Sequence, residues 1–266
     1  MNNCRICEST NLFKKFEYFK IPKGETVYPG INYEKYHRIY FKCKVCKHYS
    51  SYLKMKIDNH YSSTYNKTVY SGNLKKNFEK INNLPSFQSD NFYRVKRIDD
   101  YLNKNNFNKK KLKILDVGSG LGIFPYKMSK KNYDVTALDP DKKSCLHIRK
   151  NLKIQTLHGD FFKLRIKKRY NLITLNKVIE HVASPKKMLI KIKKILKKKG
   201  LIYIEVPDER ASLYGKDREE FHIDHLHVFS KNSLNYLTNK INLKTKFLKS
   251  IKEPSGKYTI FGIFSI

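Results

Sequence analysis

Residues 113–266 alternate short β-rich runs with helical patterns, and this alternation restricts the fold more than any other feature of the sequence. Such alternation is typical of an α/β fold, in which a parallel sheet is built by right-handed crossovers. The expected strands are 114–117, 135–138, 154–157, 172–175, 201–206, 246–251 and 258–266. A Pro254-Ser-Gly256 turn joins the last two with no helix between them, which indicates a hairpin. We therefore predict an open, mostly parallel seven-stranded sheet with a C-terminal antiparallel hairpin.

The chain has 266 residues, which suffices for one α/β domain and a smaller appendage. We predict a small N-terminal module at 1–50, a helical connector at 51–110 and the α/β domain at 111–266. The connector has two sets of apolar residues at helical spacing: Leu74, Phe78 and Ile81, then Phe92, Val95, Ile98 and Leu102. Its aromatic residues are candidates for contact with a substrate ring, or for packing against the domain: Tyr61, Tyr65 and Tyr70.

The formal net charge is +33, from 56 Lys and Arg against 23 Asp and Glu. A surplus of this size attracts anions, including nucleotides, nucleic acid and acidic lipids, without choosing among them. The lysines are spread along the whole chain, a pattern that an AT-rich coding sequence would also produce. The run 186–199 has helical spacing, which predicts an amphipathic helix with a solvated basic face. With no signal-like segment and no apolar run of about 18 residues, we expect a cytoplasmic protein without a membrane span.

Three glycines at alternate positions follow the first expected strand of the domain, in the segment Asp116-Val-Gly118-Ser-Gly120-Leu-Gly122. A turn without side chains lets a ligand approach the backbone closely. The Gly-x-Gly-x-Gly spacing, with an acid before it, differs from the Gly-x-Gly-x-x-Gly that seats a pyrophosphate in dehydrogenases. The loop therefore indicates a different cofactor.

Carboxylates follow the next two expected strands as well. Asp139 comes about 20 residues after the glycines, where it can accept hydrogen bonds from both hydroxyls of a ribose. Asp160 and Phe161 follow the third strand, and they offer an acid for an adenine amino group and an aromatic face for its ring. Ligands bind at the carboxyl edge of an open sheet, so these residues predict a nucleoside-containing cofactor there.

Residues 113–266 resemble the class I S-adenosylmethionine-dependent methyltransferases, whose successive motifs match 116–122, Asp139, Asp160 and 176–181. The resemblance implies a Rossmann-like sheet that binds S-adenosylmethionine. It also implies that Gly118 and Gly120 line the methionine part, Asp139 holds the ribose, and Asp160 with Phe161 holds the adenine, with Gly122 as a further cofactor-binding candidate. Asp116 and Asn176, in the first and fourth motifs, are the remaining cofactor-binding candidates.

Two Cys-x-x-Cys pairs lie in the N-terminal module: Cys4 with Cys7, and Cys43 with Cys46. Two such pairs can supply four thiolates to a closed structural zinc site. A segment this small needs such a staple, because it cannot build a sufficient core alone. We therefore predict a structural zinc, with a redox dithiol as the alternative.

Together with Asp90, Asn91 and Arg94, this N-terminal pattern resembles a subset of methyltransferases that includes the zinc-containing sugar C-methyltransferases. The resemblance implies a nucleotide-linked keto sugar as the methyl acceptor. The segment His222-Ile-Asp-His225 stands where those enzymes have Tyr-x-Glu-His.

Methyl transfer from a sulfonium is an in-line displacement, so the enzyme orients the reactants and, for a hydroxyl or an acidic C–H, removes a proton. Histidine suits this role near neutral pH. The resemblance makes His225 the first choice of general base, with Asp224 orienting it, His181 assisting and His222 as a further candidate. Ordinary loop hydrogen bonds and a His/Asp metal site are alternatives. The Glu-x-x-Glu-His pattern that some O-methyltransferases use for a metal would place its first acid at Lys177.

The leading hypothesis is thus a methyltransferase acting at carbon or oxygen of a small, phosphate-bearing acceptor, either a nucleotide-linked sugar or a glycan precursor. An RNA methyltransferase is the first alternative, because a zinc module and a strong positive charge suit a polyanion. A non-catalytic binding protein with the same fold is the second, and the intact cofactor loop argues against it.

Overall fold

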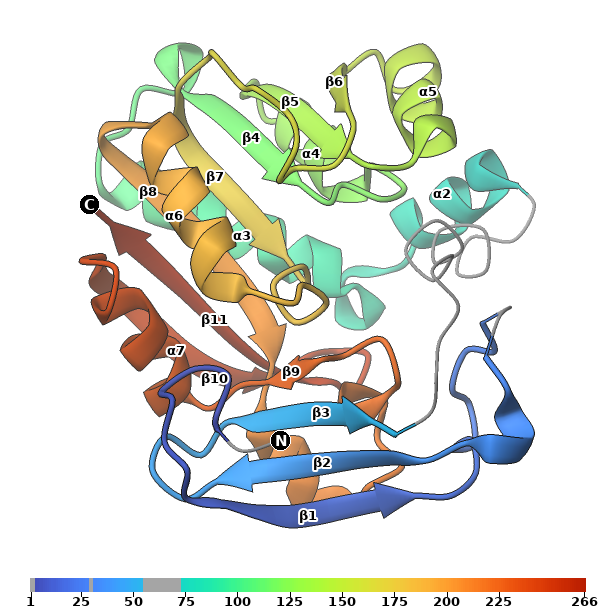
Figure 1. Cartoon of the computed structure of the whole chain (residues 1–266). Coiled ribbons are helices and arrows are strands. Elements are labelled where there is room, and N and C mark those ends of the chain that lie inside the picture. The colour runs from blue at the N-terminus through green and yellow to red at the C-terminus, as the bar shows by residue number, and fades with distance from the viewer. Residues whose placement is uncertain (1–2, 29–30, 55–72) are drawn as a thin grey trace.

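The computed structural model describes residues 3–28, 31–54 and 73–266, whose strands form a large and a small sheet (Figure 1). The large sheet consists of β4 (Lys113–Val117), β5 (Asp134–Asp139), β6 (Gln155–His158), β7 (Tyr170–Asn176), β8 (Leu196–Pro207), β10 (Lys244–Lys252) and β11 (Tyr258–Ser265). In space these strands follow the order β10-β11-β8-β7-β4-β5-β6. The strands from β6 to β8 are parallel, whereas β11 is antiparallel to β8 and β10. The predicted α/β fold, with its open, mostly parallel sheet and C-terminal hairpin, is confirmed.

Helices cover both faces of this sheet. They are α2 (Leu74–Asn82), α3 (Asp90–Lys104), α4 (Ile123–Ser129), α5 (Lys142–Asn151), α6 (Pro185–Ile195) and α7 (Lys231–Asn239). Short 3-10 helices are η1 (Tyr33–Lys35), η2 (Ser86–Gln88), η3 (Lys109–Lys111), η4 (Glu209–Tyr214) and η5 (Glu219–Phe221). Neighbouring strand residues face opposite layers, since Ile114 belongs to the core with α3 and α4 whereas Leu115 belongs to the core with α6 and α7.

The two apolar patterns expected between residues 51 and 110 form α2 and α3. Tyr61, Tyr65 and Tyr70 lie outside the described residues. Within the described ranges, none of the helices combines the length and the apolar character that crossing a membrane requires.

The predicted helix at 186–199 is wrong at its C-terminal end. Helix α6 stops at Ile195, and β8 begins at the buried Leu196, which pairs with Tyr170 of β7. At Gly200 a Cβ would lie 2.7 Å from Leu196 Cγ and 2.8 Å from the Lys197 carbonyl oxygen, so the chain can bend here because this residue is glycine. Strand pairing and the burial of Leu196 therefore override the helical spacing of the sequence, which continues beyond Ile195.

The small sheet consists of β1 (Leu12–Tyr18), β2 (Arg38–Cys43), β3 (Tyr49–Leu53) and β9 (His227–Val228), in that order and antiparallel throughout. β9 comes from the C-terminal half of the chain, and Figure 1 shows it beside β3. Tyr40 and Tyr49 are fully buried, and both pack on the ring of Phe221 at centroid distances of 5.2 and 5.4 Å. The N-terminal strands thus share a hydrophobic core with residues that follow β8 in the chain.

Ion pairs fix α3 to the large sheet. The buried Glu205 of β8 accepts hydrogen bonds from Arg94 and, at 3.1 Å, from Arg97, and Arg97 also bonds to Glu253 at 3.0 Å. Burial alone would raise the pKa of Glu205, but the attraction of the two arginines outweighs it and holds that pKa well below its usual range. Helix α3 is thereby held close to the end of β8, near the strand ends that carry the site.

Candidate active site

Asp116 lies near the carboxyl edge of the large sheet, one residue before β4 ends. Its Oδ1 accepts hydrogen bonds from the Thr174 hydroxyl at 2.7 Å and from the Asn176 amide at 2.8 Å, both on β7. Burial raises the pKa of Asp116 to about 6, although these donors oppose the shift. The side chain therefore links the ends of β4 and β7 beside the glycine loop.

The glycine loop, residues 118–122, turns between β4 and α4. Gly118 and Gly122 have φ values of 73° and 78°, which residues with side chains rarely adopt. An added Cβ would lie 2.8 Å from Val178 Cγ2 at Gly118 and 2.6 Å from Ile148 Cγ1 at Gly122. Glycine is therefore required at both positions, and at Gly122 the requirement comes from packing against α5.

Asp139 ends β5 and holds the glycine loop. Its Oδ2 accepts the Gly120 N–H at 2.8 Å, and its Oδ1 accepts the Asp141 N–H at 2.8 Å. Burial raises the pKa of Asp139 to about 6, against the effect of these backbone donors. An ionised carboxylate can accept about four hydrogen bonds, so a ribose hydroxyl could share Asp139 with the backbone.

Asn176 presents an acceptor that no described residue satisfies. Its amide nitrogen donates to Asp116, which fixes the orientation of the side chain, and its Oδ1 is buried without a hydrogen-bond partner among the described residues. An unpaired buried acceptor costs about 1–3 kcal/mol. An ammonium group, such as that of the methionine part of S-adenosylmethionine, would satisfy this oxygen. The residues at this edge therefore fit that cofactor.

Phe161 and Phe162 point into different environments after β6. Asp160 is exposed and accepts the Phe162 N–H at 2.8 Å. Phe161 is only 4% exposed and belongs to the core with α6, whereas Phe162 is 41% exposed. A ligand can reach Asp160 and Phe162 but not the face of Phe161. Sequence reasoning named Phe161 and overlooked Phe162, since adjacent phenylalanines do not reveal which one enters the core.

His181 and His225 come together from two segments of the chain. His181 lies between β7 and α6, and His225 lies in the histidine loop, residues 219–229, with 4.9 Å between their ring centroids. Each Nδ1 lies near a backbone carbonyl oxygen, of Asp224 at 2.9 Å for His181 and of Glu220 at 3.0 Å for His225. A carbonyl only accepts, so Nδ1 carries the proton in His225 and Nε2 carries the lone pair.

Burial lowers the pKa of His225 to about 4, an effect that the Asp224 carboxylate opposes and that His181 and Lys177 reinforce. The imidazole is therefore neutral at pH 7 and can accept a proton. Burial also raises the pKa of Asp224, but the attraction of His225 and His181 outweighs it, so the net shift is downward. His222 contributes backbone contacts, because its carbonyl oxygen accepts the His225 N–H at 3.0 Å.

Glu180 is the site residue whose importance the sequence did not reveal. Its side chain is fully buried, and neither carboxylate oxygen has a hydrogen-bond partner among the described residues. Burial raises its pKa, and its Oε1 lies 4.0 Å from His181 Nε2. One polar atom from each of Glu180, His181 and His225 falls within 4.8 Å of the others, so the group could share a proton or hold a cation. The sequence associated His181 with His225, but it gave no sign that the carboxylate of Glu180 would be buried beside them.

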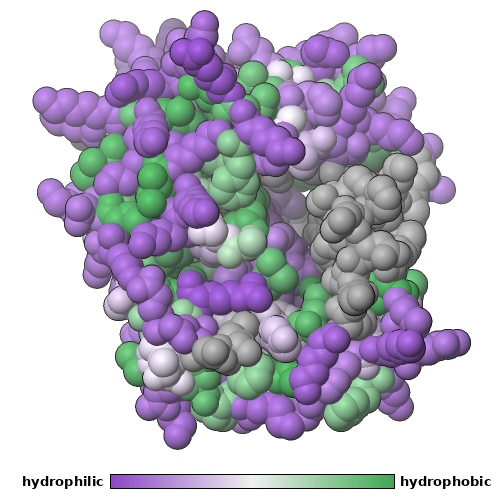
Figure 2. Space-filling model, in the orientation of Figure 1, coloured by the Kyte–Doolittle hydropathy of each residue, from purple (hydrophilic) through white to green (hydrophobic). Residues whose placement is uncertain are grey.

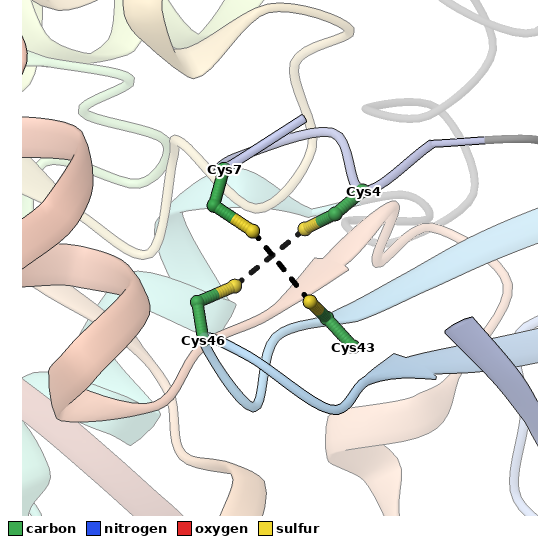
Figure 3. Close-up of side chains that lie close together, drawn as sticks. All are labelled: Cys4, Cys7, Cys43 and Cys46. Atoms are coloured by element: carbon green, nitrogen blue, oxygen red, sulfur yellow. Dashed lines mark hydrogen bonds between the residues drawn. The ribbon is translucent and has the colours of Figure 1, made fainter. Parts of the chain in front are cut away.

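The four predicted cysteines meet in one cluster (Figure 3). Cys4 Sγ lies 3.6 Å from Cys46 Sγ, and Cys7 Sγ lies 3.5 Å from Cys43 Sγ, so the two pairs cross in Figure 3. All four sulfur atoms lie within 4.8 Å of one another. Four sulfurs at about 2.3 Å from a tetrahedral zinc are about 3.8 Å apart, so the cluster could hold this metal with small adjustments.

On the face shown in Figure 2, hydrophilic side chains predominate, and both apolar and hydrophilic side chains surround a hollow in the middle of the view. In Figure 1, the glycine loop, which follows β4, and the histidine loop, which leads into β9, both face this middle region. We call the edge of the large sheet that carries Asp116, Asp139 and Asn176 the cofactor edge. The molecule thus combines this cofactor edge with a neutral histidine, as methyl transfer with proton removal requires.

A family described as a methyltransferase domain has a model that matches residues 87–246. The chain belongs to this family. This methyltransferase therefore keeps, on the family's fold, the glycine loop and the carboxylates that the sequence singled out.

Among curated proteins, the methyltransferase is similar to the ubiquinone biosynthesis O-methyltransferase of Rickettsia prowazekii (strain Madrid E), with 30% identity over 132 residues, which are 47% of this chain and 52% of that protein. It is also similar to the ubiquinone biosynthesis O-methyltransferase of Pelagibacter ubique (strain HTCC1062), with 29% identity over 110 residues, 40% of this chain and 46% of that protein. The chain spans about half the length of the curated relatives it matches.

Among solved structures, the plantazolicin methyltransferase BpumL in complex with SAH has a TM-score of 0.56 at 17% identity, over 75% of this chain and 93% of that one. The glycopeptide N-methyltransferase MtfA, complexed with S-adenosyl-L-methionine, has a TM-score of 0.52 at 10% identity, over 65% of this chain and 93% of that one. These likenesses support the fold.

Proposed function

We propose that the chain transfers the methyl group of S-adenosylmethionine to carbon or oxygen of a small anionic acceptor, a nucleotide-linked sugar or a related glycan precursor. The observation that carries the proposal is the pairing of β3 with β9, which joins the cysteine-bearing sheet to the histidine loop. The acceptor side is therefore built partly from the N-terminal strands. The net charge of +33 favours an anionic acceptor, since a positive field attracts one.

On the cofactor side, the Asn176 Oδ1 would accept a hydrogen bond from the methionine ammonium group, and Asp139 would accept the ribose hydroxyls. Asp160 would bind the adenine amino group, with the exposed ring of Phe162 beside it. S-adenosylmethionine, when bound, supplies a methyl group on a sulfonium centre that leaves as a neutral thioether. The glycine loop, held by the Gly120–Asp139 hydrogen bond, would present backbone in place of side chains to this cofactor.

On the acceptor side, His225 is proposed to act as the general base. Its Nε2 would take the proton from the acceptor hydroxyl or acidic C–H while the freed electron pair attacks the methyl carbon. The Nδ1–H bond to the Glu220 carbonyl holds the reactive tautomer, and the carboxylate of Asp224 stabilises the imidazolium that forms. His181, 4.9 Å away between ring centroids, would orient the acceptor next to the base.

We also propose that the cysteine cluster holds a structural zinc. The sulfur distances of 3.5 and 3.6 Å are close to those in a tetrathiolate site, and four thiolates leave no open position for catalysis. The zinc would stabilise the turn between β2 and β3, whose Cys46 carbonyl oxygen accepts the Ser230 hydroxyl at 2.6 Å.

A ubiquinone precursor is the second candidate acceptor. The curated relatives are named ubiquinone biosynthesis O-methyltransferases, and a ring hydroxyl also needs a base for its proton. His225 would therefore serve as the base for either acceptor. The two acceptors differ in the anionic group that a nucleotide-linked sugar carries.

A transfer assay with labelled S-adenosylmethionine tests both candidates. The panel would contain nucleoside-diphosphate hexoses and their 4-keto derivatives, catechol-ring acids as simple ring acceptors, and a short unstructured RNA, with His225→Asn as the matched variant. The proposal expects label in the sugar nucleotides with the native chain and none with His225→Asn. Label only in the ring acids or only in RNA would overturn the sugar acceptor, and full turnover by His225→Asn would remove the base.

A further inference from the structure

The N-terminal segment holds the histidine loop at two points by hydrogen bonds. The Ser51 N–H of β3 donates to the Leu226 carbonyl at 3.0 Å, next to the β3–β9 pairing. The buried carboxylate of Glu25, between β1 and β2, accepts the Ile223 N–H at 2.8 Å and pairs with Arg38 at 2.8 Å. Residues near the N-terminus therefore determine the path of a loop that comes late in the chain.

Tyr40 contacts the same loop at the backbone of the proposed base. Its hydroxyl donates to the His225 carbonyl at 2.5 Å and lies 3.1 Å from the His222 carbonyl. The side chain is fully buried, and burial raises the pKa of Tyr40 far above neutrality, so the hydroxyl keeps its proton. It therefore acts as a permanent donor toward this segment.

We propose that Tyr40 is a positioning residue for methyl transfer: its hydroxyl fixes the backbone of His225 and thereby sets where the imidazole faces the acceptor. The inference rests on the proposed role of His225 as the base. The imidazole itself is held at Nδ1 by the Glu220 carbonyl. The Tyr40 bond supplies the backbone restraint, and a displacement of about 1 Å near the reacting atoms can lower turnover about 100-fold.

Tyr49 provides a matched control in the same sheet. It is as fully buried as Tyr40, and its ring packs on the same Phe221 ring. Its hydroxyl, however, has no hydrogen-bond partner among the described residues. Removing the hydroxyl deletes the same atom from the same core in both variants, but only Tyr40→Phe deletes a bond to the histidine loop.

The experiment compares Tyr40→Phe, Tyr49→Phe and His225→Asn in the full chain. The pKa of His225 is followed by NMR of its Cε1–H, which the His225→Asn spectrum identifies, and turnover is measured with the sugar nucleotides of the panel above. Calorimetry with S-adenosylhomocysteine checks the cofactor edge. We expect Tyr40→Phe to move the pKa of His225 upward by about one unit, because a looser loop is better hydrated. We also expect its kcat to fall at least about 10-fold, with cofactor affinity unchanged, whereas Tyr49→Phe should match the native chain.

A native His225 pKa and a native kcat in Tyr40→Phe would show that the hydroxyl only packs, and equal losses in the two phenylalanine variants would lead to the same conclusion. If Tyr40→Phe does not fold, p-aminophenylalanine at position 40 restores a donor to the ring. A folded p-amino variant with native kcat supports the proposal, and one with a freely titrating His225 overturns it. Turnover by His225→Asn would instead refute the base, while the NMR comparison still decides whether Tyr40 fixes the loop.

Discussion

At the cofactor edge, hydrogen bonds connect neighbouring strands of the large sheet within the α/β domain, such as Gly120 with Asp139 and Asp116 with Asn176. Around the histidine loop, they connect opposite ends of the chain, such as Tyr40 with His225 and Glu25 with Ile223. The first region can be assembled by the domain alone, whereas the second needs the N-terminal strands. Damage to the small sheet should therefore impair methyl transfer much more than cofactor binding.

The largest effect on turnover is expected from substitution of His225, the proposed base in the histidine loop. His225→Asn should lower turnover about 1,000-fold, which corresponds to about 4 kcal/mol, because an amide cannot accept the proton. Binding of S-adenosylhomocysteine should stay within about twofold. Initial rates and calorimetry measure the two quantities, and an equal loss of both would mean that the two regions are not separable.

The next largest effect is expected from loss of the proposed zinc, which should destabilise the small sheet. Cys46→Ser, or treatment with a strong chelator, should release about one zinc per chain, as atomic emission would show. The unfolding temperature should then fall by about 10 °C, equivalent to about 3 kcal/mol, since the cysteine cluster joins the segment before β1 to the turn between β2 and β3. Cys145→Ser is the control, because this buried cysteine lies outside the cluster. Unchanged melting in the metal-free protein would separate the cluster from the stability of the small sheet.

The pKa of Asp116, about 6 in the folded chain, predicts a pH dependence at the cofactor edge. The carboxyl of an unfolded chain has a pKa of about 3.9. The folded protein therefore binds the extra proton between these values, and the stabilisation present below about pH 4 is lost as the pH rises through about 6. Denaturant unfolding should give a native-minus-Asp116→Asn difference that falls by about 2 kcal/mol over this range. A constant difference would mean that Asp116 titrates normally.

Asp139→Ala should weaken S-adenosylhomocysteine binding about 10-fold, or about 1.5 kcal/mol, through the loss of a charge-assisted hydrogen bond. The histidine loop should not respond, so the NMR pKa of His225 should stay as in the native chain. A shift of that pKa would reveal coupling between the two regions that their separate hydrogen bonds do not explain.

The smallest effect should distinguish the two phenylalanines after β6. Phe162→Ala should lower cofactor affinity about fivefold, by about 1 kcal/mol, without changing stability, since its ring is exposed. Phe161→Ala should instead destabilise the fold, because its ring lies in the core. If Phe161→Ala instead lowered cofactor affinity and Phe162→Ala did not, Phe161 would be the residue that contacts the adenine, as the sequence predicted.

The sequence predicted correctly that the glycines and carboxylates lie at successive strand ends, because these positions follow directly from the alternation of strands and helices. It failed at Ile195, where helical spacing continued but pairing of Leu196 with β7 ended the helix. It also gave no sign that Tyr40 would bond to His225, since nothing in a local pattern records contacts across 185 positions. Long-range contacts of this kind depend on tertiary packing, which propensity and periodicity do not describe.

The pairing of β3 with β9 also has a consequence for synthesis on the ribosome. Translation at about 5–20 residues per second means that the edge of β3 emerges roughly ten to thirty seconds before its partner strand. During that interval an unpaired edge and the apolar side of the tyrosine-rich strands are exposed to other nascent chains. Early capture of a metal by the four cysteines would hold these strands in a hairpin and limit misassembly until His227 and Val228 arrive.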